Sequence, residues 1–202
     1  MKGLLLKDIY TLIKQLRSLF FVLLFLSFVM SSYMYAFLIY YAAMLPITAF
    51  AYDERSKWDE LALTMPYSVQ DLVGSKYLLG LCSVLAASVF SCILLPVSAL
   101  IKGGSAYDPS GWIGILFLAL IALILMAINL PFTFLLGVEK GRIALCILLG
   151  AGVSLGFLIK EQLLPLASLL SYPLLPVLLA LTTVLLLLSL WVSTRIYKRR
   201  HF

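Results

Sequence analysis

The one long charged segment inside this otherwise apolar chain is the internal stretch of residues 53–76, which reads DERSKWDELALTMPYSVQDLVGSK. Carboxylates and cations placed together in a loop can pair with charges on a partner protein. A catalytic set is not evident, because the only histidine is His201 and Cys82, Cys92 and Cys146 lack metal-ligand or redox spacing. The stretch therefore predicts docking rather than catalysis, and no metal site is expected.

The function classes that need buried charge are excluded by the rest of the sequence. No charged residue falls in the core of a predicted membrane span, whereas ion-coupled transporters and intramembrane proteases need titratable groups there. The chain also lacks the phosphate-loop sequence of ATPases. We expect a non-enzyme that binds no cofactor, so any energy for work must come from a separate partner.

The first half of the charged stretch has the pattern of an amphipathic helix. Trp58, Leu61, Ala62 and Met65 recur at helical spacing, and Pro66 then ends the helix. This stripe could dock on a soluble motor. It could equally lie on lipid with Trp58 as an interfacial anchor, and the two interpretations are compatible.

The second half of the stretch predicts the start of a long helix. Ser68 and Asp71 have the spacing of a capping box, which places the first turn near Val69. Asp53 lies four residues before Lys57, an order that supports a helix. A force on the short docking helix could therefore pass into the root of a membrane span.

The remaining chain predicts an all-α polytopic membrane protein, a single transmembrane domain over residues 1–202. Hydrophobic residues make up 63% of the chain, well above the usual globular fraction. An amphipathic interfacial helix over residues 1–17 has an apolar stripe of Leu5, Ile9, Leu12, Ile13 and Leu16. A proline-broken outer or re-entrant segment covers residues 163–176. Six spans are expected, at residues 18–32, 35–52, 69–101, 110–138, 143–159 and 177–194.

The basic residues predict the orientation of these spans. With both termini and the loop of residues 53–76 in the cytoplasm, only Lys102 and Lys160 of the 15 lysines and arginines face outward. This distribution follows the positive-inside rule. We expect a multi-pass protein of the bacterial cell membrane.

Small residues at fixed spacing mark candidate sites of helix packing. Gly152 and Gly156 have the spacing that lets helices approach closely, and Ser83, Ala87 and Ser91 form a similar stripe. Packing within the chain is the favoured interpretation, and a dimer interface is the alternative.

Three polar residues are candidates for a substrate path. Tyr40 and Tyr41 lie deeper in their span than an aromatic belt requires. Asn129 is the most polar side chain at membrane depth, but the favoured interpretation is that it satisfies a carbonyl freed by Pro131.

Several segments together resemble the small bacterial permeases of the type-2 ATP-binding cassette (ABC) exporter family. They are MKGLLLKD at residues 1–8, DERSKWD at 53–59, LTMPYS at 63–68 and VGSKYLLG at 73–80. The layout of an interfacial helix, six spans and a broken outer segment is similar too. The chain is most similar to peptide-exporting permeases such as the phenol-soluble modulin exporter.

The resemblance implies a mechanism. Two permease subunits, identical or paralogous, would pair in the membrane above two ATPase subunits that carry the ATP and Mg²⁺. The segment from Glu54 to Met65 would be the coupling helix, with Trp58 and Leu61 as apolar anchors. Its polar contacts would be Glu54, Arg55 and Asp59. A second cytoplasmic contact could involve Glu139, Lys140 and Arg142, although plain positive-inside anchoring is the favoured role of that loop.

Two other function classes are open at this point. The chain could be a scaffold or regulatory membrane subunit of another complex, which predicts no ATPase partner. It could also be the membrane subunit of an importer, but the short outer loops and apolar spans argue against that.

Overall fold

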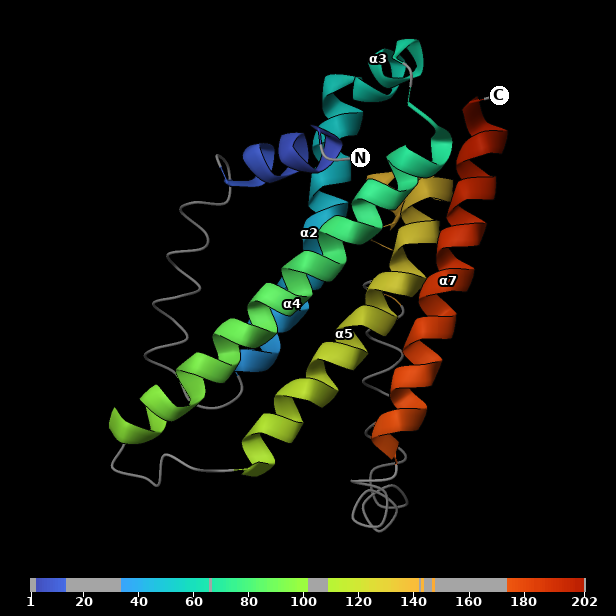
Figure 1. Cartoon of the computed structure of the whole chain (residues 1–202). Helices are drawn as coiled ribbons and strands as arrows, with labels where there is room; N and C mark the ends of the chain where they lie inside the picture. Colours follow the sequence, from blue (N-terminus) through green and yellow to red (C-terminus); the bar gives the residue numbers. More distant parts are fainter. Residues whose placement is uncertain are drawn as a thin grey trace. The chain divides into compact units, whose positions relative to one another are not determined.

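The computed structural model of the chain describes residues 3–13, 34–65, 67–101, 109–141, 143, 147 and 174–201. In these residues every element is a helix (Figure 1). An unlabelled N-terminal helix covers residues 3–13, and it is followed by α2 (Met34–Ser56), α3 (Trp58–Thr64), α4 (Val69–Ile101), α5 (Pro109–Leu136) and α7 (Leu174–His201). The chain forms two compact units, Met1–Met126 and Ala127–Phe202, and each is described by itself.

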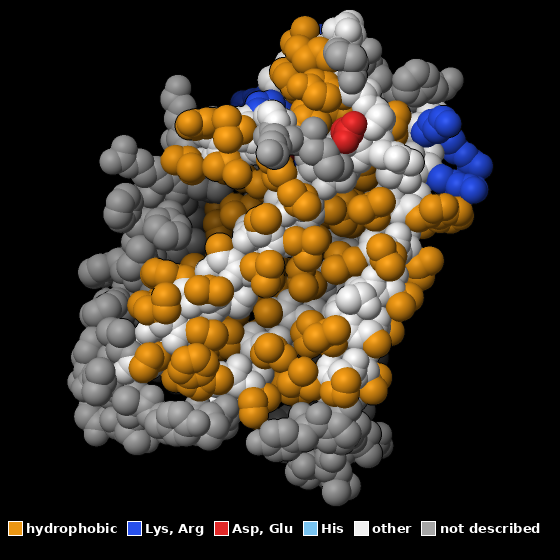
Figure 2. All heavy atoms as spheres, in the orientation of Figure 1, with side chains coloured by type: hydrophobic (Ala, Val, Ile, Leu, Met, Phe, Trp, Pro, Cys, Tyr) orange, Lys and Arg blue, Asp and Glu red, His pale blue; other side chains and the backbone are white. Residues whose placement is uncertain are grey.

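Among the residues that the structure describes, three helices are long and apolar enough to cross a membrane. The segments are Val69–Pro96 of α4, Gly111–Leu136 of α5 and Leu175–Arg199 of α7. They confirm as helices the third, fourth and last predicted spans, and Figure 2 shows apolar side chains over the visible face of α4. The first predicted span, and the fifth apart from positions 143 and 147, lie outside the described residues.

α2 confirms the second predicted span as a helix but does not end where the membrane segment was expected to end. It continues through Asp53, Glu54 and Arg55 to Ser56. The prediction of one docking helix from Glu54 to Met65 is therefore wrong. After Pro46, no proline or glycine interrupts α2 before Lys57, and Lys57 adopts a left-handed φ of 53° and separates α2 from α3.

The first unit is built on close contact between α2 and α4, which run side by side in Figure 1. The two helices approach closely at Gly80 of α4, where an added Cβ would lie 2.8 Å from Cγ of Pro46 and 2.2 Å from Sδ of Met126 on α5. Met126 is fully buried, as are Ile39 of α2 and Val84 of α4. Only a glycine at position 80 leaves room for both neighbours.

The second unit contains the end of α5 and all of α7. Phe134 of α5 and Tyr197 of α7 meet edge to face with ring centroids 6.0 Å apart. Gly137 then ends α5 with a φ of 83°, a left-handed conformation that glycine adopts at low cost. At its upper end in Figure 2, α7 carries Lys and Arg side chains.

The predicted outer segment of residues 163–176 needs one correction. α7 begins at Leu174, so Pro176 belongs to the helix rather than to a broken segment before it. A proline in the first turn costs little, because the N–H that it lacks would have no helical partner there. Residues 163–173 lie outside the described part of the chain.

The N-terminal helix packs against α2 and α4 by a face that coincides only in part with the predicted stripe, because Leu12 of the stripe lies in the core cluster and Leu5 packs against it. Leu4, Asp8 and Leu12 are buried, and Leu12 forms a core cluster with Ala49 of α2 and Leu79 of α4. Ile9 and Ile13, which were expected on the same side as Leu12, are exposed. Burial of Asp8 decides this rotation, because its carboxylate finds a cation on α4.

Candidate functional site

Four charged side chains from three helices meet in the first unit, and we call them the ionic cluster: Lys7, Asp8, Asp53 and Lys76. The ammonium of Lys76 on α4 donates to both carboxylate oxygens of Asp8 at 2.9 and 2.8 Å. It also donates to Oδ2 of Asp53, at the end of α2, at 2.5 Å. The side chains of Lys76 and Asp8 are 7% and 2% exposed, so the pairs are shielded from water.

Burial of these charges is favourable only because the cluster balances them. Two ammonium groups face two carboxylates, and each carboxylate contacts both lysines. A buried charge that loses its partner costs several kcal/mol, whereas a matched set is tolerated. The ionic cluster therefore holds the N-terminal helix against α2 and α4 in one register.

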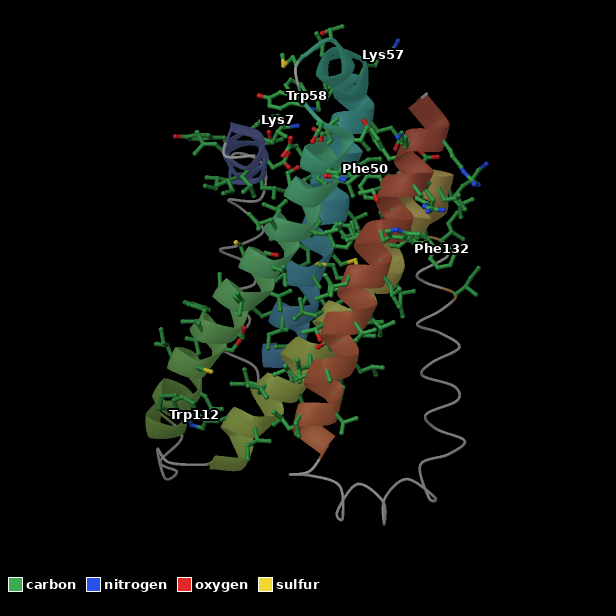
Figure 3. The ribbon with its side chains drawn as sticks, turned by 45° about the vertical axis from the view of Figure 1, so that its right-hand side comes forward. Lys7, Phe50, Lys57, Trp58, Trp112 and Phe132 are labelled. Carbon is green, nitrogen blue, oxygen red and sulfur yellow. The ribbon has the colours of Figure 1, made fainter. Side chains whose placement is uncertain are left out.

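Lys7 extends the ionic cluster across the break between α2 and α3. Its Nζ lies 2.5 Å from Oδ1 of Asp53 and 4.3 Å from the centre of the Trp58 ring. Figure 3 shows Lys7 and Trp58 directed toward each other, while Lys57 points outward. A cation at this distance from an indole face is attracted to it. Trp58 is thus partly occupied by a contact within the chain.

The surface of α3 presents apolar side chains beyond Trp58. Leu61 is 53% exposed and Met65, at the C-cap, is 39% exposed, whereas Ala62 is fully buried. The four residues of the predicted stripe therefore divide: Ala62 faces the protein, and Leu61 and Met65 remain available to a partner. Thr64 ends α3, as expected before Pro66.

The predicted capping box at the start of α4 is confirmed. The Asp71 N–H donates to the Ser68 hydroxyl oxygen at 3.1 Å, and the hydroxyl donates to Oδ2 of Asp71 at 2.7 Å. The backbone of Ser68 accepts from the N–H groups of Asp71 and Leu72. These bonds tie α4 to the segment that follows α3.

The other predicted docking residues are placed as follows. Glu54 and Arg55 are exposed on the last turn of α2. Asp59 belongs to α3, and its side chain is not among those that the structure describes. Glu139 and Lys140 are exposed just after Gly137, while Arg142 lies outside the described residues. The helix-stabilising ion pair predicted between Asp53 and Lys57 is replaced by another pairing, because Asp53 pairs with Lys7 and Lys76.

The candidate packing and path residues are only partly described. Ser83 donates to the backbone of Ala42 on α2 and Ser91 is fully buried, which supports packing within the chain for that stripe. Gly152 and Gly156 lie outside the described residues. Tyr40 and Tyr41 are half-buried on α2.

Asn129 is buried on α5, but the carbonyl freed by Pro131 has another donor. Pro131 lacks the N–H that would reach Ala127, and the hydroxyl of Ser189 on α7 donates to that carbonyl. The carbonyl of Asn129 itself accepts from Thr133 at 2.9 Å. Sequence spacing could not identify Ser189, because it lies 62 positions away.

The ionic cluster was also missed by sequence reasoning, although two signals pointed to it. Asp8 interrupts the leucine-rich face of the N-terminal helix, and Lys76 stands almost two turns inside α4, directly before its long apolar run. Both are unusual unless paired. In the described part of the chain, no group of three or more His, Cys, Asp and Glu could hold a metal ion.

Long apolar helices joined by a charged, partly exposed element define a multi-pass helical membrane protein. The sequence matches the family model described as ABC-2 family transporter protein over residues 3–198, nearly the whole chain, and the chain belongs to that family. Members of the family are membrane components of transporters and are generally not enzymes themselves. No curated protein and no solved structure matches the chain.

Proposed function

We propose that the chain is the permease subunit of an ATP-driven exporter and that α3 docks on a separate ATPase subunit. Membership of the ABC-2 family supports this, since its permeases typically pair with ATPases of the ABC class. The observation that carries the docking site is the surface of α3. Leu61 and Met65 project from a short helix that is set apart from α2 by the left-handed Lys57.

The exposed residues near α3 suit a protein partner. A stable interface needs apolar anchors surrounded by polar groups. Leu61 and Met65 supply the anchors, and Glu54 and Arg55 on the adjoining turn of α2 supply charges of both signs. Trp58 contributes less than a fully exposed tryptophan would, because Lys7 covers its ring.

The proposed cargo is an amphipathic or hydrophobic molecule, with a peptide as the first choice, and the proposed direction is outward. The candidate spans are strongly apolar, which favours a cargo that can leave water. Export into the bilayer or beyond would need two permease copies, so a homodimer or a pair with a paralogue is part of the proposal. Both termini and α3 are assigned to the cytoplasm by the positive-inside rule.

The experiment is affinity purification of the tagged chain from its native membrane in mild detergent. Wild type is compared with Leu61→Asp and with the exposed second loop changed at two positions, Glu139→Lys and Lys140→Glu. We expect an ABC ATPase to co-purify with wild type and with the loop variant, and to be lost from Leu61→Asp. Folding of each variant is checked by its elution as a single species.

Two other outcomes would redirect the proposal. Loss of the ATPase from the loop variant alone would move docking to Glu139 and Lys140. Absence of an ATPase even from wild type would favour a scaffold or regulatory subunit. Once a complex is purified, a synthetic Leu/Lys amphipathic helix should stimulate its ATP hydrolysis, whereas a scrambled peptide of the same composition should not.

A further inference from the structure

Lys57 breaks the helix between α2 and α3, so contacts outside the backbone must fix the orientation of α3 relative to α2. α3 has only seven residues, Trp58–Thr64, and a helix of that length is not stable by itself. Ala62 anchors one side of it by burial. A second anchor is Lys7, which comes from the N-terminal helix rather than from the loop itself.

We propose that Lys7 is a positioning residue that fixes α3 relative to α2, and that the N-terminal helix thereby becomes part of the path between the docked ATPase and the membrane helices. This inference rests on the proposed function. One ammonium group contacts both sides of the break: Asp53 of α2 at 2.5 Å and the Trp58 ring of α3 at 4.3 Å. Any reorientation of α3 must therefore break one of these contacts or carry the N-terminal helix with it.

The second connection lies one residue further along the N-terminal helix. Asp8 accepts two hydrogen bonds from Lys76 of α4, and Leu12 packs with Ala49 and Leu79. The N-terminal helix is thus bound to α3 through Lys7 and to α4 through Asp8. A displacement of α3 reaches α4 through this helix as well as through the chain that joins α3 to α4.

This arrangement separates the roles of two residues that the sequence pattern treats alike. Leu61 faces outward and contacts the partner, whereas Trp58 faces Lys7 and contacts the chain itself. Changes at Leu61 should weaken docking. Changes at Lys7 should leave docking in place and weaken the transfer of motion to α4.

The test uses Trp58 as a spectroscopic reporter in the full-length chain. Trp112→Phe and Trp191→Phe remove the other tryptophans, both of which are exposed. In this background Lys7→Met removes the charge but keeps an unbranched side chain, and Lys7→Arg restores a cation that can also stack on indole. Lys57→Met is the matched control, because Lys57 is exposed beside the same helix.

We expect Lys7→Met to change the emission maximum of Trp58 and to raise its quenching by acrylamide, and we expect Lys7→Arg and Lys57→Met to resemble the parent. The Lys7 side chain is 25% exposed, so its removal leaves the two carboxylates with Lys76 on a side of the ionic cluster that water reaches, and folding of the variant is checked by its elution as a single species. In the purified complex with Mg-ATP, Lys7→Met should retain the ATPase subunit. Its peptide-stimulated hydrolysis should fall by about fivefold or more.

Three results would overturn the inference. One is a Trp58 spectrum that is the same in Lys7→Met and the parent. Another is a failure of Lys7→Arg to restore the parent spectrum, and the third is full stimulation of hydrolysis in Lys7→Met. Failure of the proposed function is recognised separately, because no ATPase would then co-purify with wild type while the Trp58 spectra would still report on positioning.

Discussion

Ser189 of α7 donates its hydroxyl to the backbone carbonyl of Ala127, the carbonyl that Pro131 leaves without a helical partner in α5. The first unit repeats the arrangement. Ser83 of α4 donates at 2.8 Å to the carbonyl of Ala42, which Pro46 leaves free in α2. Water cannot replace a lost hydrogen bond inside a membrane, so a proline there is tolerated when a neighbouring helix supplies the donor.

The first prediction concerns Ser189. Replacement by alanine leaves the Ala127 carbonyl without this donor and should lower the free energy of unfolding by about 1–2 kcal/mol. Thermal unfolding in detergent measures the change. Thr183→Ala is the control on the same helix, because Thr183 is exposed and bonds only locally, to the carbonyl of Ala180.

The cause can be isolated in a double-mutant cycle with Pro131→Ala. Alanine at position 131 restores the N–H that reaches Ala127 in an ordinary helix. Ser189→Ala should then cost less in the Pro131→Ala background than in wild type. An equal cost in both backgrounds would show that Ser189 acts through something other than the freed carbonyl.

The second prediction compares two glycines in apolar helices. Gly80→Ala would place a methyl group 2.8 Å from the rigid ring of Pro46 and even closer to Met126, so it should destabilise the protein by about 1–3 kcal/mol. Gly114 of α5 has nothing within 4 Å of an added Cβ. Gly114→Ala should therefore be neutral or stabilise by up to about 1 kcal/mol. Gly80→Ala should lower the melting temperature in detergent, and Gly114→Ala should leave it unchanged or raise it.

The third prediction concerns Lys76 in the ionic cluster. Lys76→Met leaves two buried carboxylates with Lys7 as their only cation in the cluster, and it should destabilise the protein by about 3–5 kcal/mol. Adding Asp8→Asn restores the charge balance, so the double variant should melt above Lys76→Met alone. Lys140→Met, at an exposed position, is the control and should melt like wild type. If the double variant is less stable than the single one, charge balance is not what stabilises the ionic cluster.

The fourth prediction concerns the capping box of α4. Ser68→Ala removes the acceptor of the Asp71 N–H and should cost about 1 kcal/mol of helix stability. Hydrogen exchange of the amides at positions 69–72 should become faster, while the rest of α4 stays protected. Ser68→Asn keeps a side-chain acceptor and should restore slow exchange. Unchanged exchange in Ser68→Ala would show that neighbouring contacts, not the cap, hold this turn.

Local signals in the sequence were sufficient for the elements of α4, α5 and α7. The cap at Ser68 and the long apolar runs each act within one or two turns of the chain, so their consequences can be derived from neighbouring residues. The membrane class follows from composition for the same reason. The family resemblance, carried by segments of the loop and N-terminus, agrees with the family match over residues 3–198.

What the sequence by itself determined was therefore the helical membrane class, the apolar spans that are described and the position of the charged loop. Only the tertiary structure decided which residues of that loop face outward. Asp53 lies in the last turn of α2 and Trp58 faces Lys7. Lys7, 46 and 51 positions away in the sequence, contacts both of them. Pairing between distant charges depends on how helices pack, and no local periodicity encodes it. The same holds for Ser83 and Ser189, whose hydroxyls each donate to a carbonyl of a neighbouring helix.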